Sequence, residues 1–342
     1  MKIERGKNKK LNRPTSYDVA RKAGVSQSAV SRCFRPGKSV SKKNREKILA
    51  AAKELGYQPN AIAQGLITRR SNLVAVVISN LTNLAYPEVL AEFTQRLSAQ
   101  GIRVLLFTLA AESEVNEALD QIWRYRVDGA IVAARLSDKQ LSAFAERGVP
   151  VVLYNRVGGE VSAASVRCDS VNGEAELVDA LVSAGHQNFG IIAGPSDSYV
   201  GQERVSAASS RLEKYGFEAA VVPGNFDYAS GEEGMRELVR ITTGKLDAVI
   251  CANDLLAIGA IDCARFELNL RVPDDLSIVG FDGVGPARWR GYQLTTIRQP
   301  VRRMTDAAVA MLIDRIDQAD LPPEQRVFAG ELLLGNSART RK

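Results

Sequence analysis

Residues 15–34 of the 342-residue chain read TSYDVARKAGVSQSAVSRCF, and this stretch decides how the amino-terminal part of the chain folds. The pattern predicts two short helices joined by a tight turn. Thr15 can cap the first helix, and Asp18, three residues later, completes a capping box. Gly24 stands where the first helix must end, because glycine adopts a left-handed backbone conformation without strain. Ser26 is placed to cap the second helix.

The start of the second predicted helix carries side chains that suit contact with DNA. We expect Gln27, Ser28 and Ala29 to be exposed there, with Arg32 one turn later. Short polar groups, an amide and a guanidinium can read base edges when a helix of this kind lies in the major groove. For these twenty residues alone, a surface helical hairpin is the alternative interpretation.

Charge is distributed unevenly along the chain, whose net charge is +6. Residues 1–70 carry 18 Lys and Arg against 4 Asp and Glu, a net charge of +14, whereas residues 71–342 carry 27 against 35, a net charge of −8. This asymmetry favours the DNA-binding interpretation, because a fourfold cationic excess at one end indicates a polyanionic partner. Release of counterions from the DNA should make the affinity depend on salt.

Composition argues against several classes of protein. No apolar run is long enough to span a membrane, and no apolar segment of a secretory signal follows the basic start. The four cysteines form no CxxC pair, and the chain has one histidine, His186, which we interpret as a structural turn residue. We therefore expect no metal, no cofactor, no membrane association and a location in a reduced cytoplasm.

The amino-terminal part is expected to contain three segments. Residues 1–12 form a disordered basic tail and residues 13–59 a helix-turn-helix domain, while residues 60–71 form a hinge or linker that becomes helical only with a partner. The third helix of the domain should run from Ser41 to about Leu55. Its apolar side chains should close a small core: Ile48, Leu49, Ala52 and Leu55.

From residue 72 to the end, short β-branched runs alternate with helical stretches. Such alternation predicts two doubly wound parallel-sheet lobes of an α/β core, with a cleft between the facing strand ends. We assign lobe 1 to residues of about 72–168 and 300–327, and lobe 2 to residues 169–299 and 328–340. The predicted strands are LVAVVI (73–78), IRVLLF (102–107), GAIVA (129–133), VPVVL (149–153), NFGIIAG (188–194), EAAVVPG (218–224), DAVICA (247–252) and LSIVGF (276–281).

The sequence gives no support for catalysis. It contains no GxGxxG after a strand, no GxxxxGK[ST] and no GxSxG turn, and its Asp and Glu residues are expected to be scattered on helix surfaces. We therefore expect no catalytic residues. An enzyme that uses the cleft would need a paired nucleophile and base.

Polar residues gather instead where four of the predicted strands end. Each could cap the helix that follows it, but together they form the arrangement of a small polar binding site. Amides, carboxylates and arginine suit a ligand with hydroxyl groups, such as a sugar, although a sugar acid or a nucleobase stays open. These residues are Ser79, Asn80 and Asn83, then Asn155 and Arg156, then Asn253 and Asp254, and lastly Asp282.

The motifs together resemble the lac repressor (LacI/GalR) family of bacterial transcription regulators, from about Pro14 to Ser337. The motifs that carry the resemblance are TSYDVARKAGVSQSAVSR, VSKKNREKILAAAKELGYQPN, AGHQNFGIIAGP, CANDLLAIGAI, VPDDLSIVGFDG and LTTIRQP. The resemblance implies a homodimer on a palindromic operator and a core similar to periplasmic sugar-binding proteins. The chain ends without a leucine-heptad extension, so no tetramer is expected.

The resemblance also assigns residues to the two sites. Residues 60–68 match a hinge helix in the minor groove, with Leu66 as the side chain wedged between base pairs, and Gly65 departs from the bulkier residues common at its position. The residues expected to contact DNA are Thr15, Ser16, Tyr17, Ser26, Gln27, Ser28, Ala29, Ser31, Arg32, Asn60, Ala63 and Leu66. The residues expected to contact the effector are Ser79, Asn83, Asn155, Arg156, Arg204, Phe226, Asn253, Asp254 and Asp282.

We therefore predict a DNA-binding transcriptional regulator, most simply a repressor, whose operator affinity responds to a small polar effector bound between the lobes. The alternative is a solute-binding protein of a transport system, which would share the two-lobed core. The sequence leaves open which effector binds, and whether it releases the protein from DNA or recruits it.

Overall fold

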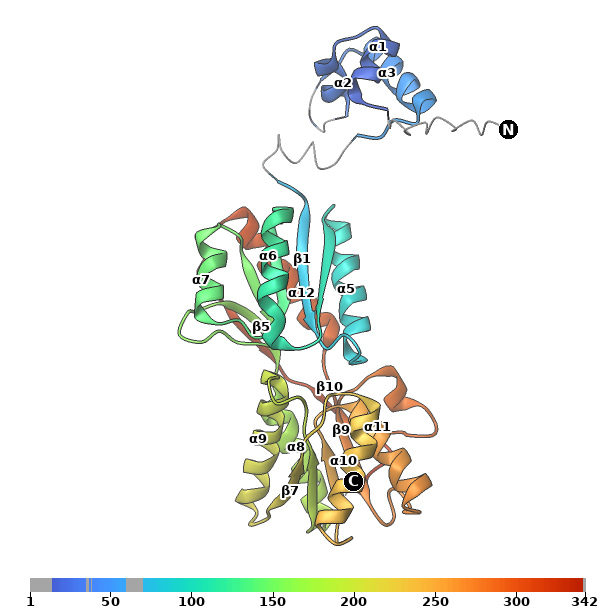
Figure 1. The fold of residues 1–342 in the computed structure, drawn as a ribbon, viewed down its shortest axis with the longest axis vertical. Coiled ribbons are helices and arrows are strands. Elements are labelled where there is room, and N and C mark those ends of the chain that lie inside the picture. Colours follow the sequence, from blue (N-terminus) through green and yellow to red (C-terminus); the bar gives the residue numbers. More distant parts are fainter. Residues whose placement is uncertain (1–13, 35–36, 38, 60–69, 341–342) are drawn as a thin grey trace, which may run out of the picture. The chain divides into compact units, whose positions relative to one another are not determined.

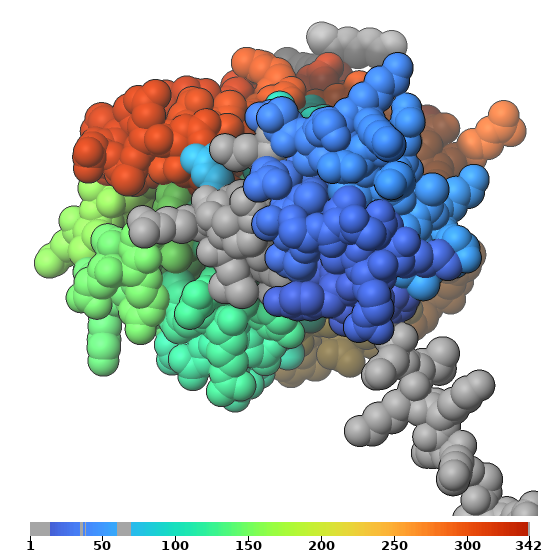
Figure 2. Space-filling view, turned by 90° about the horizontal axis from the view of Figure 1, so that it is seen from above, coloured from blue at the N-terminus to red at the C-terminus, as the bar shows by residue number. Residues whose placement is uncertain are grey.

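The computed structural model describes residues 14–34, 37, 39–59 and 70–340, and divides the chain into two compact units, residues 1–71 and 72–342. The first unit contains α1 (Ser16–Ala23), α2 (Gln27–Cys33) and α3 (Lys42–Leu55). Figure 2 shows the outer surface of this unit in blue, and its buried side chains form one small apolar core. The predictions for the basic tail and for the hinge residues Asn60, Ala63 and Leu66 concern residues outside the described ranges.

Local sequence signals set the ends of these helices, as predicted. The Asp18 amide donates to Thr15 Oγ1 over 3.3 Å and the Thr15 amide donates to Asp18 Oδ2 over 2.9 Å, which completes the capping box. Gly24 ends α1 with φ 63°, in the left-handed region. The Ala29 amide donates to Ser26 Oγ over 3.3 Å and caps α2.

Two expectations for the small core were wrong. Leu49 is 44% exposed, whereas Ile48, Ala51 and Ala52 are buried, because the face of α3 that meets the other helices is narrower than the apolar pattern suggested. Ala29 is buried rather than exposed, since it shares a helix face with Cys33 and packs into the three-helix core.

The second unit consists of two lobes, each built on a six-stranded sheet (Figure 1). We call the part built on the first sheet lobe 1 and the part built on the second sheet lobe 2. The strand order in lobe 1 is β11 (Gln325–Phe328), β5 (Ala164–Cys168), β4 (Val151–Tyr154), β3 (Gly129–Ala133), β1 (Leu73–Ser79) and β2 (Arg103–Leu109). The order in lobe 2 is β12 (Glu331–Leu333), β10 (Thr295–Arg298), β9 (Ser277–Asp282), β8 (Ala248–Cys251), β6 (Phe189–Ile192) and β7 (Ala219–Val222).

Both sheets are parallel apart from the pairing of β12 with β10, which is antiparallel. Strand β1 is almost wholly buried along its length because helices cover both faces of its sheet. The fold class predicted from the sequence is confirmed. All eight predicted strands are present, and β5, β10, β11 and β12 are additional.

Helices cover both faces of each sheet. In lobe 1, α5 (Ala85–Ala99) and α12 (Val301–Asp317) contribute to the apolar cluster on one face, and α6 (Val115–Tyr125) and α7 (Asp138–Glu146) to that on the other. In lobe 2, α8 (Ser170–Ser183) and α9 (Tyr199–Lys214) share one cluster, and α10 (Tyr228–Ile241) and α11 (Asp254–Asp262) the other. Three short helical turns complete the unit: η1 (Glu112–Glu114), η2 (Cys263–Glu267) and η3 (Gly285–Arg288).

Candidate functional site

The surface of α2 and the start of α1 carry most of the described residues that were expected to contact DNA. Thr15, Tyr17, Ser28 and Arg32 are exposed, and Tyr17 is 68% exposed although it is aromatic. The Tyr17 ring is therefore accessible to a partner, as are the polar groups beside it.

Gln27 is held in place rather than left free in solvent. Its Nε2 donates to Ser16 Oγ over 3.2 Å, so the side chain bridges the two helices and is half-buried. Ser26 Oγ and Ser28 Oγ lie 3.0 Å apart and share a hydrogen bond. The polar groups at the start of α2 are therefore pre-arranged by contacts within this unit.

In the second unit, one cavity brings together six of the nine residues expected to contact the effector. The space between its lining side chains, including the part open to solvent, is about 560 Å³. Asn83 and Arg156 come from lobe 1, and Arg204 and Phe226 come from lobe 2. The six predicted residues that line the cavity are Asn83, Asn155, Arg156, Arg204, Phe226 and Asp282.

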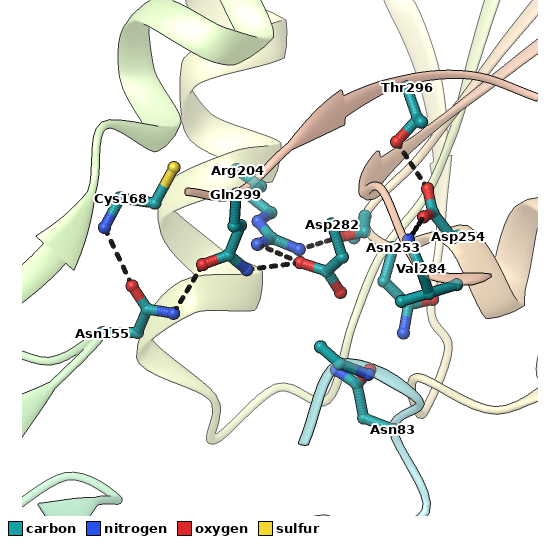
Figure 3. A network of polar contacts seen from close by, with 12 residues as sticks. Asn83, Asn155, Cys168, Arg204, Asn253, Asp254, Asp282, Val284, Thr296 and Gln299 are labelled. Atoms are coloured by element: carbon teal, nitrogen blue, oxygen red, sulfur yellow. Dashed lines mark hydrogen bonds and ion pairs between the residues drawn. The ribbon is translucent and has the colours of Figure 1, made fainter. Parts of the chain in front are cut away.

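A chain of hydrogen bonds crosses this cavity (Figure 3). Asn155 Nδ2 donates to Gln299 Oε1 over 2.9 Å, and Gln299 Nε2 donates to Asp282 Oδ1 over 2.7 Å. Arg204 Nη2 donates to the same Asp282 oxygen over 2.7 Å, and its Nη1 donates to the Ala252 carbonyl over 2.6 Å. The Arg204 guanidinium also lies 3.8 Å from the centre of the Phe281 ring. Asp282 is thus fixed from two sides.

Backbone strain accumulates at the same place. Asn155, Phe226 and Asp282 have φ values of 51°, 59° and 120°, in the region that favours glycine. Such strain costs roughly 1–3 kcal/mol per residue and occurs preferentially at binding and active sites. This observation supports the assignment of the cavity as a functional site.

Three predicted effector contacts do not line the cavity. Ser79 Oγ donates to the Ala133 carbonyl over 3.1 Å. Asn253 caps α11, because its Oδ1 accepts from the Leu256 amide over 2.8 Å, as the helix-capping alternative would have it. Asp254 is completely buried and accepts from the Val284 amide and from Thr296 Oγ1.

Several carboxyl groups are buried, against the expectation that acidic residues lie on helix surfaces. Burial, followed by the charge of Asp282, raises the pKa of Asp254 to about 8. Burial also raises the pKa of Glu174 to about 8, and neither of its oxygens has a hydrogen-bond partner among the described residues. Glu112 is buried as well, in an ion pair with Arg156.

Sequence reasoning missed Gln299, Tyr86 and Tyr154 as lining residues. Gln299 directly follows β10, a strand that was recognised only as part of a family motif. The two tyrosines lie among apolar residues and their hydroxyl groups gave no signal. Burial raises the pKa of the Tyr154 hydroxyl far above its usual value, and this hydroxyl has no hydrogen-bond partner in the described part of the chain.

Neither a metal site nor a membrane span is found in the parts of the chain that the structure describes. Within these ranges, no group of three or more His, Cys, Asp or Glu side chains could hold a metal ion. No helix there is both long and apolar enough to cross a membrane. His186 is buried beside Arg339 and Asp247, in agreement with a structural role.

A helix-turn-helix unit joined to a two-lobed binding core defines a ligand-responsive DNA-binding regulator. Residues 15–60 match the lacI family of bacterial regulatory proteins, and residues 178–338 match the periplasmic binding protein-like domain. The chain belongs to the lacI family, and it is a transcriptional regulator rather than a solute-binding protein of a transport system.

Individual relatives agree with this assignment. The transcriptional regulator CelR of Thermobifida fusca is 32% identical over 336 residues, which cover 95% of this chain and 98% of CelR. The lac repressor dimer bound to operator and the anti-inducer ONPF has a TM-score of 0.83 at 28% identity, covering 95% of this chain and 98% of that one. A CelR–cellobiose complex has a TM-score of 0.71 at 31% identity, covering 95% of this chain and all of that one. These relatives are transcriptional regulators and not enzymes.

Proposed function

We propose that this regulator is a repressor that binds a palindromic operator as a homodimer, and that an uncharged polyhydroxylated molecule of the sugar class is its effector. It would act on the chromosome in the bacterial cytoplasm. In this proposal residues 13–59 read the operator, residues 60–71 form the hinge and residues 72–342 bind the effector and form the dimer.

The observation that carries the effector class is the hydrogen-bonding capacity of the cavity. Asp282 Oδ2 has no hydrogen-bond partner among the described residues. A carboxylate oxygen accepts hydrogen bonds, so it can bind a ligand hydroxyl group, which donates one, but not a ligand carboxylate, which donates none. The Tyr154 hydroxyl has no hydrogen-bond partner among the described residues either. The rings of Tyr86, Tyr154 and Phe226 supply apolar faces against which the carbon skeleton of a sugar can pack.

A relative provides independent support for a sugar. The CelR structure mentioned above holds cellobiose, and its whole length aligns with this chain. The cavity residues that we propose to contact the effector are Asn83, Asn155, Arg156, Arg204, Phe226, Asp282 and Gln299, with Tyr86 and Tyr154 as the aromatic faces. The other three predicted residues would hold the elements around the cavity in place rather than touch the ligand: Ser79, Asn253 and Asp254.

The test is a thermal-shift screen of the full chain with neutral sugars, sugar acids and nucleobases. A ligand that binds the native state stabilises it by mass action and so raises the melting temperature. At a ligand concentration of 100 Kd the free energy of unfolding increases by about 2.7 kcal/mol. We expect a neutral sugar to produce the shift and Asp282→Asn to abolish it. If sugar acids or nucleobases alone produce it, the proposed effector class is wrong.

DNA recognition is tested separately, by selecting operator sequences from random duplexes with the full chain. We expect a palindromic consensus, because each protomer of a symmetric dimer reads one half-site. Arg32→Met should relax base preference within the half-site, whereas Arg45→Met, at an exposed position of α3, should not. A consensus without symmetry would contradict the dimeric arrangement.

A further inference from the structure

Glu112 occupies an unusual position beside the cavity. It is the first residue of η1 in lobe 1, and its side chain is only 2% exposed. Its carboxylate accepts from Arg156 twice: from Nε to Oε2 over 3.2 Å and from Nη2 to Oε1. A bidentate pair of this kind is the strongest arrangement open to a carboxylate and a guanidinium.

The backbone around Glu112 holds this carboxylate in place. The Arg135 amide donates to Oε2 over 2.6 Å, so this oxygen accepts both from the backbone of lobe 1 and from Arg156. The Glu112 amide in turn donates to Asp197 Oδ2 over 3.1 Å, and Asp197 lies in lobe 2, between β6 and α9. The carboxylate cannot turn away from Arg156 without the loss of the bond from the Arg135 amide.

The ion pair balances the charge of Arg156, and its neighbours accept from most of its N–H groups. Its Nη1 donates to the Asn155 carbonyl over 2.8 Å, and its Nη2 lies 3.5 Å from Ser79 Oγ. Burial acts to lower the pKa of Arg156, but the neighbouring Tyr86 and Glu112 raise it overall, so the guanidinium stays charged. Among the described residues, Glu112 is the carboxylate paired with this charge.

The same balance holds for the other cation of the cavity. Among the described lining side chains the cations are Arg156 and Arg204, and Arg204 is paired with Asp282 over 2.7 Å. Two buried guanidinium groups thus face two buried carboxylates, and the remaining charged lining residue, Glu88, is acidic and exposed. An anionic ligand would meet no unmatched positive charge, and a like charge close to either carboxylate is unfavourable.

We propose that Glu112 is a specificity-determining residue, which neutralises Arg156 and thereby makes the cavity reject anionic ligands and accept uncharged ones. Glu112 acts through Arg156 and is a positioning residue rather than a contact of the ligand. The inference rests on the proposed function, because it concerns selectivity at the same cavity, but its test does not require the natural effector.

The test compares Glu112→Gln with the unchanged full chain. The substitution keeps the size of the side chain and the backbone amide that contacts Asp197, and removes only the negative charge. Melting temperatures are measured with sodium gluconate and with sodium phosphate, each against sodium chloride at the same ionic strength. We expect half-saturation by both anions at concentrations at least tenfold lower in Glu112→Gln than in the unchanged protein, because the freed guanidinium can bind a carboxylate or phosphate.

Two controls separate charge from structure. Glu117→Gln, at an exposed position of α6, should behave like the unchanged protein. The double variant Glu112→Gln/Arg156→Met should lose the gained anion binding. Equal anion binding by Glu112→Gln and the unchanged protein, or anion binding that survives in the double variant, would overturn the proposal.

If Glu112→Gln does not fold, Arg156→Met gives the complementary test. It leaves the negative charge of Glu112 without a cation, so the cationic sugar glucosamine should bind at least tenfold more tightly than glucose. Equal affinities for the two sugars would contradict the proposal. A failure of the proposed function looks different: no neutral sugar would stabilise the unchanged protein, whatever the anions do to the variants.

Discussion

At the scale of single residues, burial of the Glu174 carboxyl makes the stability of the folded protein depend on pH. The residue is 1% exposed on α8, and burial raises its pKa from 4.5 to about 8, with smaller effects of Arg204, which lowers the pKa, and of Asp282, which raises it. Between these two values the folded protein keeps a proton that the unfolded chain has lost. The folded state then binds more protons, so stability falls as pH rises through this window.

We therefore predict that Glu174→Gln weakens the pH dependence of stability between about pH 5 and pH 8. The contribution of Glu174 is full below its unfolded pKa and is lost as pH rises through its folded pKa, at up to about 1.4 kcal/mol per pH unit. Calorimetric melting of the full chain at a series of pH values measures this. Asp254, whose pKa is also raised to about 8, stays in both proteins and cancels in the comparison.

The control for this prediction is Glu176→Gln, at an exposed position of the same helix. Its pH profile should follow that of the unchanged protein. A Glu174→Gln profile with the same slope as the unchanged protein would mean that Glu174 is ionised in the folded state.

Residues also mark the limit of what the sequence could predict about the site. Asn155 and Asp282 were identifiable because they follow strongly apolar strands whose ends converge at one edge. Glu112 and Gln299 were not, because a glutamate in a polar turn and a glutamine before a proline look like ordinary surface residues. Their role depends on partners 44 and 17 residues away, which only the folded chain brings together.

At the scale of elements, two of the four strands that the sequence missed, β11 and β12, differ from a predicted strand such as β1. Strand β1 is buried on both faces and is therefore a continuous apolar run. Strands β11 and β12 lie at sheet edges and consist of exposed and half-buried residues, so they contain polar side chains such as Gln325 and Glu331. An edge strand is stabilised by its neighbour in the sheet more than by its own composition.

The α1–Gly24–α2 turn gives a prediction at this scale. Gly24 has φ 63°, and a Cβ at this position would meet no atom within 4 Å, so the cost of a side chain comes from the backbone alone. Gly24→Ala should destabilise the helix pair by about 1–2 kcal/mol. Amide hydrogen exchange in α1 and α2 of the full chain should then be faster by a factor of roughly 5–30.

Two variants control this prediction. Gly24→Asn should cost less, because asparagine tolerates the left-handed region better than alanine. Gly101→Ala, at a left-handed glycine that follows α5 in the other unit, should leave exchange in α1 and α2 unchanged. Equal exchange rates for Gly24→Ala and the unchanged protein would show that the turn does not need glycine.

At the scale of the whole molecule, sequence and structure divide the chain into parts with opposite charge. The +14 of residues 1–70 and the −8 of residues 71–342 suit one part to DNA and make the other repel it. This division could be predicted from composition alone, without knowledge of any contact. Any coupling between the two parts could not be predicted in this way, because it depends on contacts that only the folded chain makes.

Reciprocity between the two ligands is the prediction that belongs to this scale. If an effector in the cavity changes operator affinity, the operator must change effector affinity by the same factor, typically about 5–150-fold. Titrations of the full chain with each ligand, in the presence and absence of the other, measure both factors at one salt concentration, since DNA affinity falls steeply with salt. Gln299→Met should reduce both factors together. Gln299 bonds both to Asn155 of lobe 1 and to Asp282 of lobe 2, so it connects the ligand contacts of the two lobes. The matched variant Gln325→Met, at an exposed position of β11, should leave both factors unchanged. Two factors that differ beyond error would show only that a titration had not reached equilibrium, because the binding cycle must close. Unchanged factors in Gln299→Met would contradict the role of Gln299 in the coupling.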